Sequence, residues 1–373
     1  MRFRQTLRGS TGRAQRYNWV MFFSGIGTAV PERRYTQAEC WQAARRTPQF
    51  GRLSARSKAT LQQVLLNSES GIDGRYLALE HLDEVFDANP DVLTARYVRH
   101  APALAAQAAR NALDDAQVSA REVDAVLVST CTGYLCPGLT SYTTELLGLR
   151  SDALGLDLVG QGCGAALPNL RAAEALIAAR RARTVLSICV EVCSAAFYID
   201  DDPGVLISAC IFGDGAGAVV LTHEPRAHKR SVHWRGAWSH MAPAERDALR
   251  FEARAGMLRN ILTPEVPALA GEHAAALLAG ALEDASLTPR DIRTWIWHAG
   301  GKRVLERLRA AAGLEPAHIE RSARILREYG NLSSPFVYFV LDAALRERAP
   351  GGAWWLSSFG AGFSCHGALL AVA

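Results

Sequence analysis

Two patterns of hydrophobic and polar residues follow one another near the middle of the chain. Apolar residues alternate over 154–159, which predicts a buried strand, and they recur at helical spacing over 165–179, which predicts a helix. Gly162, Cys163 and Gly164 lie between these two segments. The pattern therefore places Cys163 at a turn from a strand into a helix.

The same two periodicities recur along the rest of the chain. Thr36 and Glu39 have the spacing of a capping box, so a helix is expected to begin there. The other predicted elements are a strand over 21–31, helical segments over 45–74 and 101–116, and a strand over 123–129.

Three stretches of sequence occur twice, in the same order. Residues 112–129 resemble residues 281–298, which lie 169 positions later. The pair 162–163 resembles 330–331, and the glycine-rich segment 212–215 resembles 359–362. Repeats in one order indicate a duplicated α/β unit. We expect the two copies to pack back to back, as layers of sheet enclosed by helices.

The repeats divide the chain into an N-terminal extension and two halves. Residues 1–20 are basic, polar and without periodicity, so we interpret them as a disordered or loosely attached extension. The first half, 21–228, carries Cys163, and the second half, 229–373, carries a histidine and an asparagine of interest. The polar stretch 222–231 is the predicted seam between them.

Composition narrows the class of protein. The chain has 373 residues, of which 49% are apolar and 21% charged, so it has enough apolar residues for a large core. Its formal charge of +4 is too small and too scattered to indicate nucleic-acid binding. No apolar run approaches the ~18 residues of a membrane span, so we expect a cytoplasmic protein without one.

The eight cysteines predict neither a disulfide scaffold nor a metal site. No two of them are spaced as Cys-x-x-Cys, and no histidine follows at the spacing of a zinc ligand. Several lie in apolar segments, as reduced and buried thiols do. The sequence also lacks a phosphate-binding glycine loop and a dinucleotide-binding fingerprint. We therefore expect no metal and no cofactor.

Three residues carry candidate chemistry. Cys163 lies near the positive end of a helix, which favours the thiolate, and a nearby histidine would favour it further. His298 follows a predicted strand just before two glycines, and Asn331 precedes an apolar helix. Each residue also has a structural interpretation: an inert buried thiol, a capped or surface histidine, and an asparagine N-cap.

A cysteine, a histidine and an asparagine support two kinds of reaction. In a cysteine hydrolase the imidazole deprotonates the thiol and the amide orients the imidazole. In a condensing enzyme the thiol holds an acyl group as a thioester. The imidazole and the amide then stabilise the enolate that forms when a malonyl group loses carbon dioxide. The internal duplication favours the condensing enzyme.

Five motifs in this sequence resemble those of the chalcone synthase-like type III polyketide synthases. They are Gly162-Cys163-Gly164, Phe212-Gly213-Asp214-Gly215, Trp297-His298-Ala299-Gly300-Gly301, Tyr329-Gly330-Asn331-Leu332-Ser333-Ser334 and Phe359-Gly360-Ala361-Gly362. The resemblance implies an α/β protein with the thiolase fold, in which two duplicated halves form five layers in the order αβαβα. It also implies a homodimer that loads an acyl starter, extends it with malonyl-CoA and cyclises the poly-β-keto chain.

The resemblance assigns a role to each of the three candidates. Cys163 is the nucleophile, and His298 and Asn331 form the decarboxylation and oxyanion site. Phe212 is the aromatic gate beside the thiol. The resemblance also implies a second gate, at Arg259 or its neighbour Asn260. The positions implied to line the substrate cavity are Cys131, Cys193, Ala196, Ser208, Ser333, Arg259 and Asn260.

Several positions differ from those of the plant enzymes. Plant chalcone synthases carry threonine where this chain has Cys131, Cys193 and Ala196, so the cavity is expected to be less polar. Glu69 stands where a lysine that binds CoA is expected. The nearby basic residues that we expect to replace it are Arg52, Arg56 and Lys58.

These differences are more similar to the bacterial alkylresorcinol and alkylpyrone synthases, whose members accept long fatty acyl starters. A less polar tunnel suits an aliphatic chain, because each buried methylene contributes ~0.8 kcal/mol. The expected products are an alkylresorcinol, an alkylresorcylic acid or an alkylpyrone. The missing lysine suggests that the starter arrives on an acyl carrier protein instead of CoA. Two alternatives stay open: a ketoacyl synthase that performs one condensation, and an acyl-binding protein without turnover.

Overall fold

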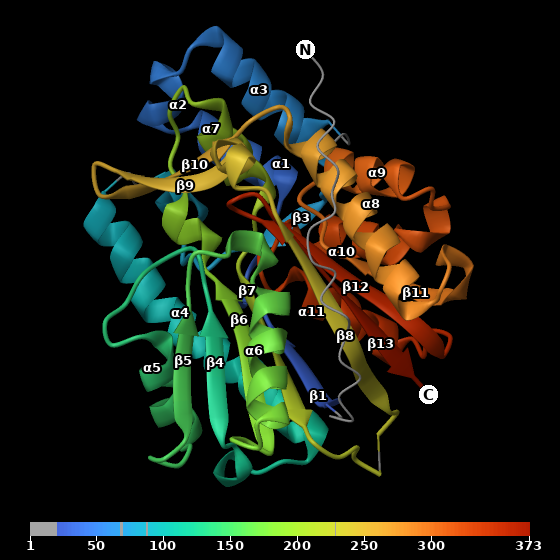
Figure 1. Ribbon diagram of the computed structural model, residues 1–373. Coiled ribbons are helices and arrows are strands. Elements are labelled where there is room, and N and C mark those ends of the chain that lie inside the picture. The colour runs from blue at the N-terminus through green and yellow to red at the C-terminus, as the bar shows by residue number, and fades with distance from the viewer. Residues whose placement is uncertain (1–20, 68–69, 87–88, 228) are drawn as a thin grey trace.

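A nine-stranded sheet is the largest feature of the computed structural model, which describes residues 21–67, 70–86, 89–227 and 229–373 (Figure 1). Its strand order is β11-β12-β13-β8-β1-β7-β6-β4-β5. β1 pairs with β8 at a single position, Phe22 with His233, so two parts of the sheet meet there. The first part contains β1 (Phe22–Ala29), β4 (Ala125–Ser129), β5 (Leu154–Leu158), β6 (Thr184–Glu191) and β7 (Gly215–Thr222). The second contains β8 (Val232–Met241), β11 (Ile292–Trp297), β12 (Gly352–Gly360) and β13 (Ser364–Val372).

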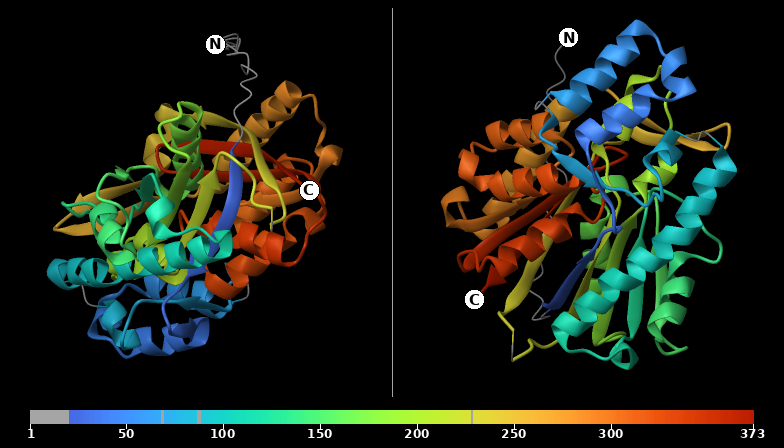
Figure 2. Two further views of the ribbon diagram at one scale, coloured as in Figure 1. Left: turned by 90° about the horizontal axis from the view of Figure 1, so that it is seen from below. Right: turned by 180° about the vertical axis from the view of Figure 1, so that it is seen from behind.

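Helices form three layers around the two parts of the sheet. α6 (Ala166–Ala178) and α11 (Phe336–Arg346) contact both parts and therefore lie between them. α4 (Pro90–Ala116) and α5 (Leu139–Leu147) pack on the first part from outside, and α8 (Val266–Ala285) packs on the second (Figure 2). α9 (Lys302–Ala311) packs on α8, and α10 (Glu320–Tyr329) packs on α11. The layers follow the order αβαβα of the thiolase fold, as predicted.

Smaller elements gather at one end of the layers. Figure 1 shows α1, α2 and α3 there, together with α7 and a separate hairpin of β9 and β10. Their bounds are α1 (Gln37–Arg45), α2 (Pro48–Arg52), α3 (Ala55–Leu66), α7 (Pro203–Ile211), β9 (Leu249–Arg254) and β10 (Met257–Leu262). β2 (Arg34–Thr36) and β3 (Gly74–Tyr76) form a second small hairpin. The candidate cavity described below lies between α7 and the β9–β10 hairpin.

The predicted duplication is visible in the conformation of single residues. α4 is followed by Gln117 and α8 by Ser286, 169 positions apart, and both have left-handed backbones with φ of 52° and 55°. Two residues later a capping box, at Ser119 in one copy and Thr288 in the other, begins a short 3-10 helix. β4 and β11 come next. The repeated sequence therefore folds into the same helix, cap and strand twice.

Helix signals in the sequence located one helix start correctly but not the bounds of the other predicted helices. The capping box of Thr36 and Glu39 is present at the start of α1, as predicted. The helix predicted over 101–116 is longer, because Asn89 caps it at Pro90. The segment predicted as helical over 45–74 is instead two short helices and the beginning of β3.

β5 is where the prediction of a buried strand was wrong. Its position in the sequence is correct, but it forms the edge of the sheet, and Leu154 and Leu156 are 43% and 37% exposed. Apolar alternation identifies a strand with an apolar face, and it does not identify what covers that face. The predicted seam at 222–231 does fall between β7 and β8. The division at 228 stays a prediction, and residues 1–20 lie outside the described residues.

Candidate active site

Cys163 lies in the turn from β5 to α6, as the sequence predicts. It is the middle residue of a short 3-10 helix over Gly162–Gly164, and Gly162 has a left-handed φ of 55° that favours glycine. The backbone N of Gly360 approaches Gly164 so closely that an added Cβ would lie 3.3 Å from it. The hydroxyl of Ser333 donates to the Cys163 sulfur at 3.3 Å. The thiol is thus held against a residue from the second half of the chain.

Asn331 lies between α10 and α11, and its backbone is bonded to the end of α7. Its N–H donates to Ile211 O at 2.8 Å, and its carbonyl accepts from Gly213 N at 3.0 Å. Its side-chain Nδ2 donates to Gly300 O at 3.2 Å, while Oδ1 accepts the Ser333 N–H at 2.8 Å. The last bond matters because Ser333 has a left-handed φ of 60°, which is a strained conformation for serine. The amide therefore fixes the residue that donates to the thiol.

His298 follows β11 and its ring is buried. The ring packs edge-on against Phe336 and Phe359, with centroids 5.3 and 5.0 Å away. Among the residues that the structure describes, neither ring nitrogen has a hydrogen-bond partner. Burial lowers the pKa of His298 to about 3, so the ring is neutral near pH 7. A buried polar ring without a partner is unusual in a folded protein and is available to a substrate.

The three candidates lie in one neighbourhood. Cys163 contacts Ser333, which is hydrogen-bonded to Asn331. Asn331 is in turn hydrogen-bonded to Gly300, which lies two residues after His298. No hydrogen bond joins His298 to Cys163 within the described part of the chain. The structure thus brings together residues from both halves, as the duplication implied.

The ionisation of Cys163 differs from the expectation of a resident thiolate. Burial raises the pKa of this thiol to about 12, although the hydrogen bond from Ser333 acts in the opposite direction. The negative charge of Glu191 raises it further. The positive end of the α6 helix dipole does not offset the effect of burial on the pKa of Cys163. A neutral His298 supplies no positive charge that would lower this pKa. Because burial disfavours a lone charge on either side chain, deprotonation of the thiol requires a paired charge nearby.

A cavity with about 360 Å³ of empty space lies next to Ser333. Seven residues predicted from the resemblance line it: Cys131, Cys193, Ala196, Ser208, Phe212, Asn260 and Ser333. Five further lining residues were not predicted: Thr132, Phe197, Val205, Phe251 and Leu258. Ser333, one of its lining residues, contacts the Cys163 sulfur.

Arg259 was predicted to line this cavity, and that prediction was wrong. Side chains alternate along a strand, so adjacent residues of β10 point to opposite faces. Asn260 points into the cavity and donates to Ser208 Oγ at 2.7 Å. Arg259 points away and pairs with Asp202 and Glu252. Of the two residues, Asn260 alone lines the cavity, and its role as a second gate stays a prediction.

Glu191 is a buried carboxylate that the sequence analysis did not single out. It ends β6 and is 0% exposed. One oxygen accepts the N–H of Cys131 and the hydroxyl of Thr132, both at 2.9 Å. The other accepts the hydroxyl of Ser334 and lies 3.3 Å from the hydroxyl oxygen of Ser333. Burial raises its pKa above the usual range, and these hydrogen bonds offset only part of that rise. The available signal was a single charged residue at the end of a mostly apolar strand.

Replacement of Glu191 by alanine is expected to lower the free energy of unfolding by at least about 1–3 kcal/mol, because several buried donors lose their acceptor. Glu191→Gln retains one oxygen and should lose less. Thermal unfolding measures both effects, with Glu283→Ala, an exposed glutamate on α8, as the matched control. Equal melting temperatures for the Glu191→Ala and Glu283→Ala variants would contradict a structural role for this carboxylate.

The residues expected to bind CoA lie outside the cavity lining. Arg52 and Arg56 are exposed on α2 and α3, and Lys58 lies with its Nζ 5.6 Å from the centre of the Phe50 ring. Their role in CoA binding stays a prediction. Glu69, which stands at the position of the expected lysine, lies outside the described residues.

No helix in the described ranges has both the length and the apolar character that crossing a membrane requires. Within the same ranges, no three histidine, cysteine, aspartate or glutamate side chains are grouped as metal ligands.

Two family models match the chain in succession. The description "FAE1/Type III polyketide synthase-like protein" applies to the model that matches residues 26–235, which is more than half of the chain. The model for the C-terminal domain of chalcone and stilbene synthases matches residues 237–371. The two matches meet at the start of the second half of the fold.

Individual relatives and solved structures agree with the family models. A 3,5-dihydroxyphenylacetyl-CoA synthase of Streptomyces toyocaensis is 28% identical over 358 residues, which are 93% of this chain and 88% of the relative. A 1,3,6,8-tetrahydroxynaphthalene synthase of Streptomyces peucetius subsp. caesius is 29% identical over 357 residues, 93% of this chain and 92% of the relative.

Two crystal structures extend the similarity to the fold. PKS-I from the brown alga Ectocarpus siliculosus has a TM-score of 0.87 and 26% identity, and the match covers 96% of this chain and 100% of that one. The 1,3,6,8-tetrahydroxynaphthalene synthase of Streptomyces coelicolor A3(2) has a TM-score of 0.83 and 25% identity, with coverage of 94% and 99%. This chain therefore belongs to the type III polyketide synthases, thiolase-fold acyltransferases that catalyse the decarboxylative condensation of malonyl-CoA.

Proposed function

We propose that this synthase holds its acyl starter as a thioester on Cys163 and condenses it with malonyl-CoA at His298 and Asn331. The observation that carries the proposal is the set of contacts between these residues. Ser333 donates to the Cys163 sulfur at 3.3 Å, and Asn331 holds the Ser333 N–H at 2.8 Å. His298, whose ring nitrogens have no hydrogen-bond partner among the described residues, lies two residues before Gly300, which accepts a hydrogen bond from Asn331. Cys163 and Asn331 thus both contact Ser333, which lines the cavity.

Loading transfers the acyl group from its carrier to the Cys163 sulfur. The sulfur forms a bond to the acyl carbon, and the carrier thiolate departs. The proton of Cys163 moves to His298, which can accept it because its ring is neutral near pH 7. The resulting ion pair avoids a lone buried charge. The imidazolium then returns the proton to the departing thiolate.

Condensation follows on the loaded enzyme. The carboxylate of malonyl-CoA leaves as carbon dioxide, and its electron pair remains on an enolate. His298 and Asn331 donate hydrogen bonds to the enolate oxygen, where charge develops. Asn331 can do so because Nδ2 carries two N–H groups and uses one of them on Gly300 O. The enolate carbon attacks the Cys163 thioester and frees the thiolate, and repeated rounds build the chain that cyclises.

The cavity lining supports an aliphatic, fatty acyl starter. Much of the lining is apolar or thiol-bearing, and Ser208 and Asn260 bond to each other instead of presenting both polar groups to a substrate. Each buried methylene of such a starter contributes ~0.8 kcal/mol. The corresponding products are alkylresorcinols, alkylresorcylic acids or alkylpyrones.

A small aromatic polyketide is the second candidate. The named relatives are synthases of 3,5-dihydroxyphenylacetyl-CoA and 1,3,6,8-tetrahydroxynaphthalene. Such a product would need no long starter.

Mass spectrometry of the products from malonyl-CoA and a series of acyl-CoA starters distinguishes these candidates. The aliphatic proposal predicts products whose mass increases with the starter and that contain several malonyl-derived units. One product of constant mass for every starter would overturn it in favour of the aromatic candidate. A single condensation would indicate a ketoacyl synthase. Parallel reactions with the same starters on an acyl carrier protein test the carrier, and faster loading from CoA would exclude the carrier-protein preference.

We also propose that two copies of this chain associate through β5. The outer edge of this strand is unpaired among the described strands, and Leu154, Leu156 and Val159 are 43%, 37% and 56% exposed. An unpaired edge with apolar side chains is a template for pairing with another chain. A second copy presents the same edge, as a two-fold interface requires.

Leu156→Lys is expected to convert the dimer to a monomer, because it places a charge in the middle of this interface. Light scattering after size exclusion should give roughly twice the 40.4 kDa chain mass for the unmodified protein. Leu66→Lys, on a leucine of α3 that is 44% exposed, is the matched control and should stay dimeric. A monomeric unmodified protein, or a dimeric Leu156→Lys variant, would show that β5 is not the interface.

A further inference from the structure

The β9–β10 hairpin forms one wall of the cavity without belonging to the large sheet. Its strands pair in register, with Arg259 opposite Glu252 and Asn260 opposite Phe251. Phe251, Leu258 and Asn260 line the cavity, and Arg259 lies on the opposite face. No main-chain ladder joins the described hairpin to the nine-stranded sheet. Its distance from the rest of the cavity therefore depends on contacts with neighbouring segments, of which α7 is one.

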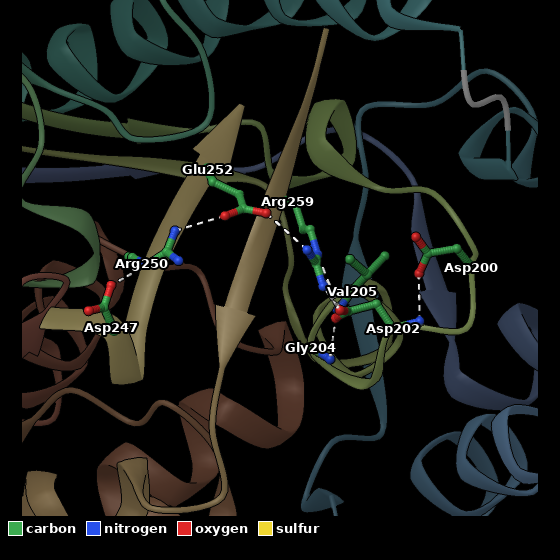
Figure 3. A network of polar contacts seen from close by, with 8 residues as sticks. All are labelled: Asp200, Asp202, Gly204, Val205, Asp247, Arg250, Glu252 and Arg259. Atoms are coloured by element: carbon green, nitrogen blue, oxygen red, sulfur yellow. Dashed lines mark hydrogen bonds and ion pairs between the residues drawn. The ribbon is translucent and has the colours of Figure 1, made fainter. Parts of the chain in front are cut away.

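Arg259 joins the hairpin to the start of α7 (Figure 3). Its Nε donates to Asp202 Oδ2 at 3.1 Å, and Nη2 pairs with the same carboxylate. The other oxygen, Oδ1, accepts the N–H groups of Gly204 and Val205 at 2.9 and 3.1 Å, so Asp202 is also the N-cap of α7. Partial burial raises the pKa of Asp202, but its hydrogen bonds lower it by more, which keeps the carboxylate charged. One carboxylate thus holds both the helix and the hairpin.

A second contact joins the same two elements on the cavity side. Asn260 Nδ2 donates to Ser208 Oγ at 2.7 Å, and Ser208 Oγ donates to Gly204 O at 2.6 Å. The backbones are close here, because an added Cβ on Gly204 would lie 2.5 Å from Asn260 O. α7 and β10 are therefore fastened on both sides of the strand, by an ion pair outside and an amide–hydroxyl bond inside.

The remaining ion pairs of the hairpin do not reach α7. Arg250 pairs with Asp247 and with Glu252, both at 2.9 Å, and Glu252 also accepts from Arg259 (Figure 3). Arg250 and Arg259 thus share a carboxylate and a hairpin, but only Arg259 of the two contacts Asp202. Replacing Arg250 therefore weakens the hairpin without breaking its connection to α7, whereas replacing Arg259 breaks that connection.

We propose that Arg259 and Asp202 form a clasp that sets the width of the cavity, and thereby determines the starter length and the number of extensions. Both are positioning residues, since neither lines the cavity. They act on the two walls that hold the growing chain, which are α7 with Val205, Ser208 and Phe212 and the hairpin with Phe251, Leu258 and Asn260. The clasp rests on the polyketide synthase activity of the family and is independent of which starter this chain prefers.

The test compares Arg259→Ala and Asp202→Asn with the unmodified enzyme, using malonyl-CoA and starters of several lengths. Asp202→Asn removes the charge but keeps an oxygen that can cap α7. Mass spectrometry should show the ratio of longer to shorter products, or of long to short starters incorporated, rising at least about threefold. Arg259→Lys restores a positive charge and should recover part of the original ratio. Malonyl-CoA decarboxylation without a starter should be unchanged, because the clasp does not touch Cys163, His298 or Asn331.

Arg250→Ala is the matched control and should leave the product ratio unchanged. Native-like melting temperatures show that the variants are folded. An unchanged ratio in both Arg259→Ala and Asp202→Asn would overturn the clasp, and so would an equal shift in Arg250→Ala. If the unmodified enzyme instead makes no product with any fatty acyl starter, the starter proposal fails. The clasp is then judged on the products from malonyl-CoA alone, where the same shift is expected.

Discussion

Cys163→Ala is expected to abolish acyl loading and product formation while leaving slow decarboxylation of malonyl-CoA. Alanine removes the only proposed site for the starter thioester, so no extension can follow. His298 and Asn331 keep their positions, because neither hydrogen-bonds to the Cys163 side chain within the described residues. They can still stabilise an enolate. Loading is measured with a radiolabelled acyl-CoA, and decarboxylation by the release of carbon dioxide.

Cys365→Ala is the matched control for the loss of a thiol. Cys365 is a buried free cysteine on β13 that does not line the cavity. Its variant should load acyl groups and form products at close to the original rate. Acyl loading at an undiminished rate in Cys163→Ala would show that another group is the nucleophile. Cys131 is the first residue to examine in that case, since its sulfur lies 3.5 Å from Ser333 Oγ.

Asn331→Asp is expected to lower the rate of malonyl-CoA decarboxylation by ~10²–10³, the usual effect of losing one oxyanion donor. Aspartate keeps the oxygen that accepts the Ser333 N–H and removes the Nδ2 donor. It also places a negative charge next to the developing enolate. His298→Gln should lower the decarboxylation rate by a similar factor. It removes the imidazole, whose two ring nitrogens have no partner among the described residues and can therefore bind the enolate oxygen.

Acyl loading provides the internal control for Asn331→Asp. The Ser333 hydroxyl still reaches the Cys163 sulfur in this variant, so loading should remain within a few-fold of the original rate. Cys163→Ala would then lose acyl loading but retain decarboxylation, whereas Asn331→Asp would lose decarboxylation but retain acyl loading. Undiminished decarboxylation in Asn331→Asp would show that the amide does not stabilise the enolate.

Sequence patterns that act locally predicted the corresponding structure well. The cap at Thr36 is set by neighbours within a few positions. The turn at Cys163 was predicted for the same reason, from a strand pattern, two glycines and a helix pattern. The repeated sequence folds alike in its two copies, where Gln117 and Ser286 share a left-handed backbone that was not itself predicted. Resemblance to a known family then supplied most of the cavity lining, which local patterns alone do not indicate.

Features that depend on distant contacts were not predictable in this way. Whether β5 is buried depends on what covers the sheet edge, and the alternation of its residues is the same in either case. The choice between Arg259 and Asn260 depends on the register of a hairpin, where a shift of one residue exchanges the two faces. Glu191 is held by donors from two segments that are far apart in sequence. The ionisation of Cys163 likewise follows from its burial, which its position near a helix start did not reveal.

Peptide mass mapping of the enzyme after brief exposure to a starter acyl-CoA tests the central assignment most directly. The account predicts that the acyl group is found on the peptide containing Cys163, and that subsequent malonyl-CoA removes it from that peptide into product. An acyl group on any other residue, or one on Cys163 that malonyl-CoA does not remove, would contradict the account.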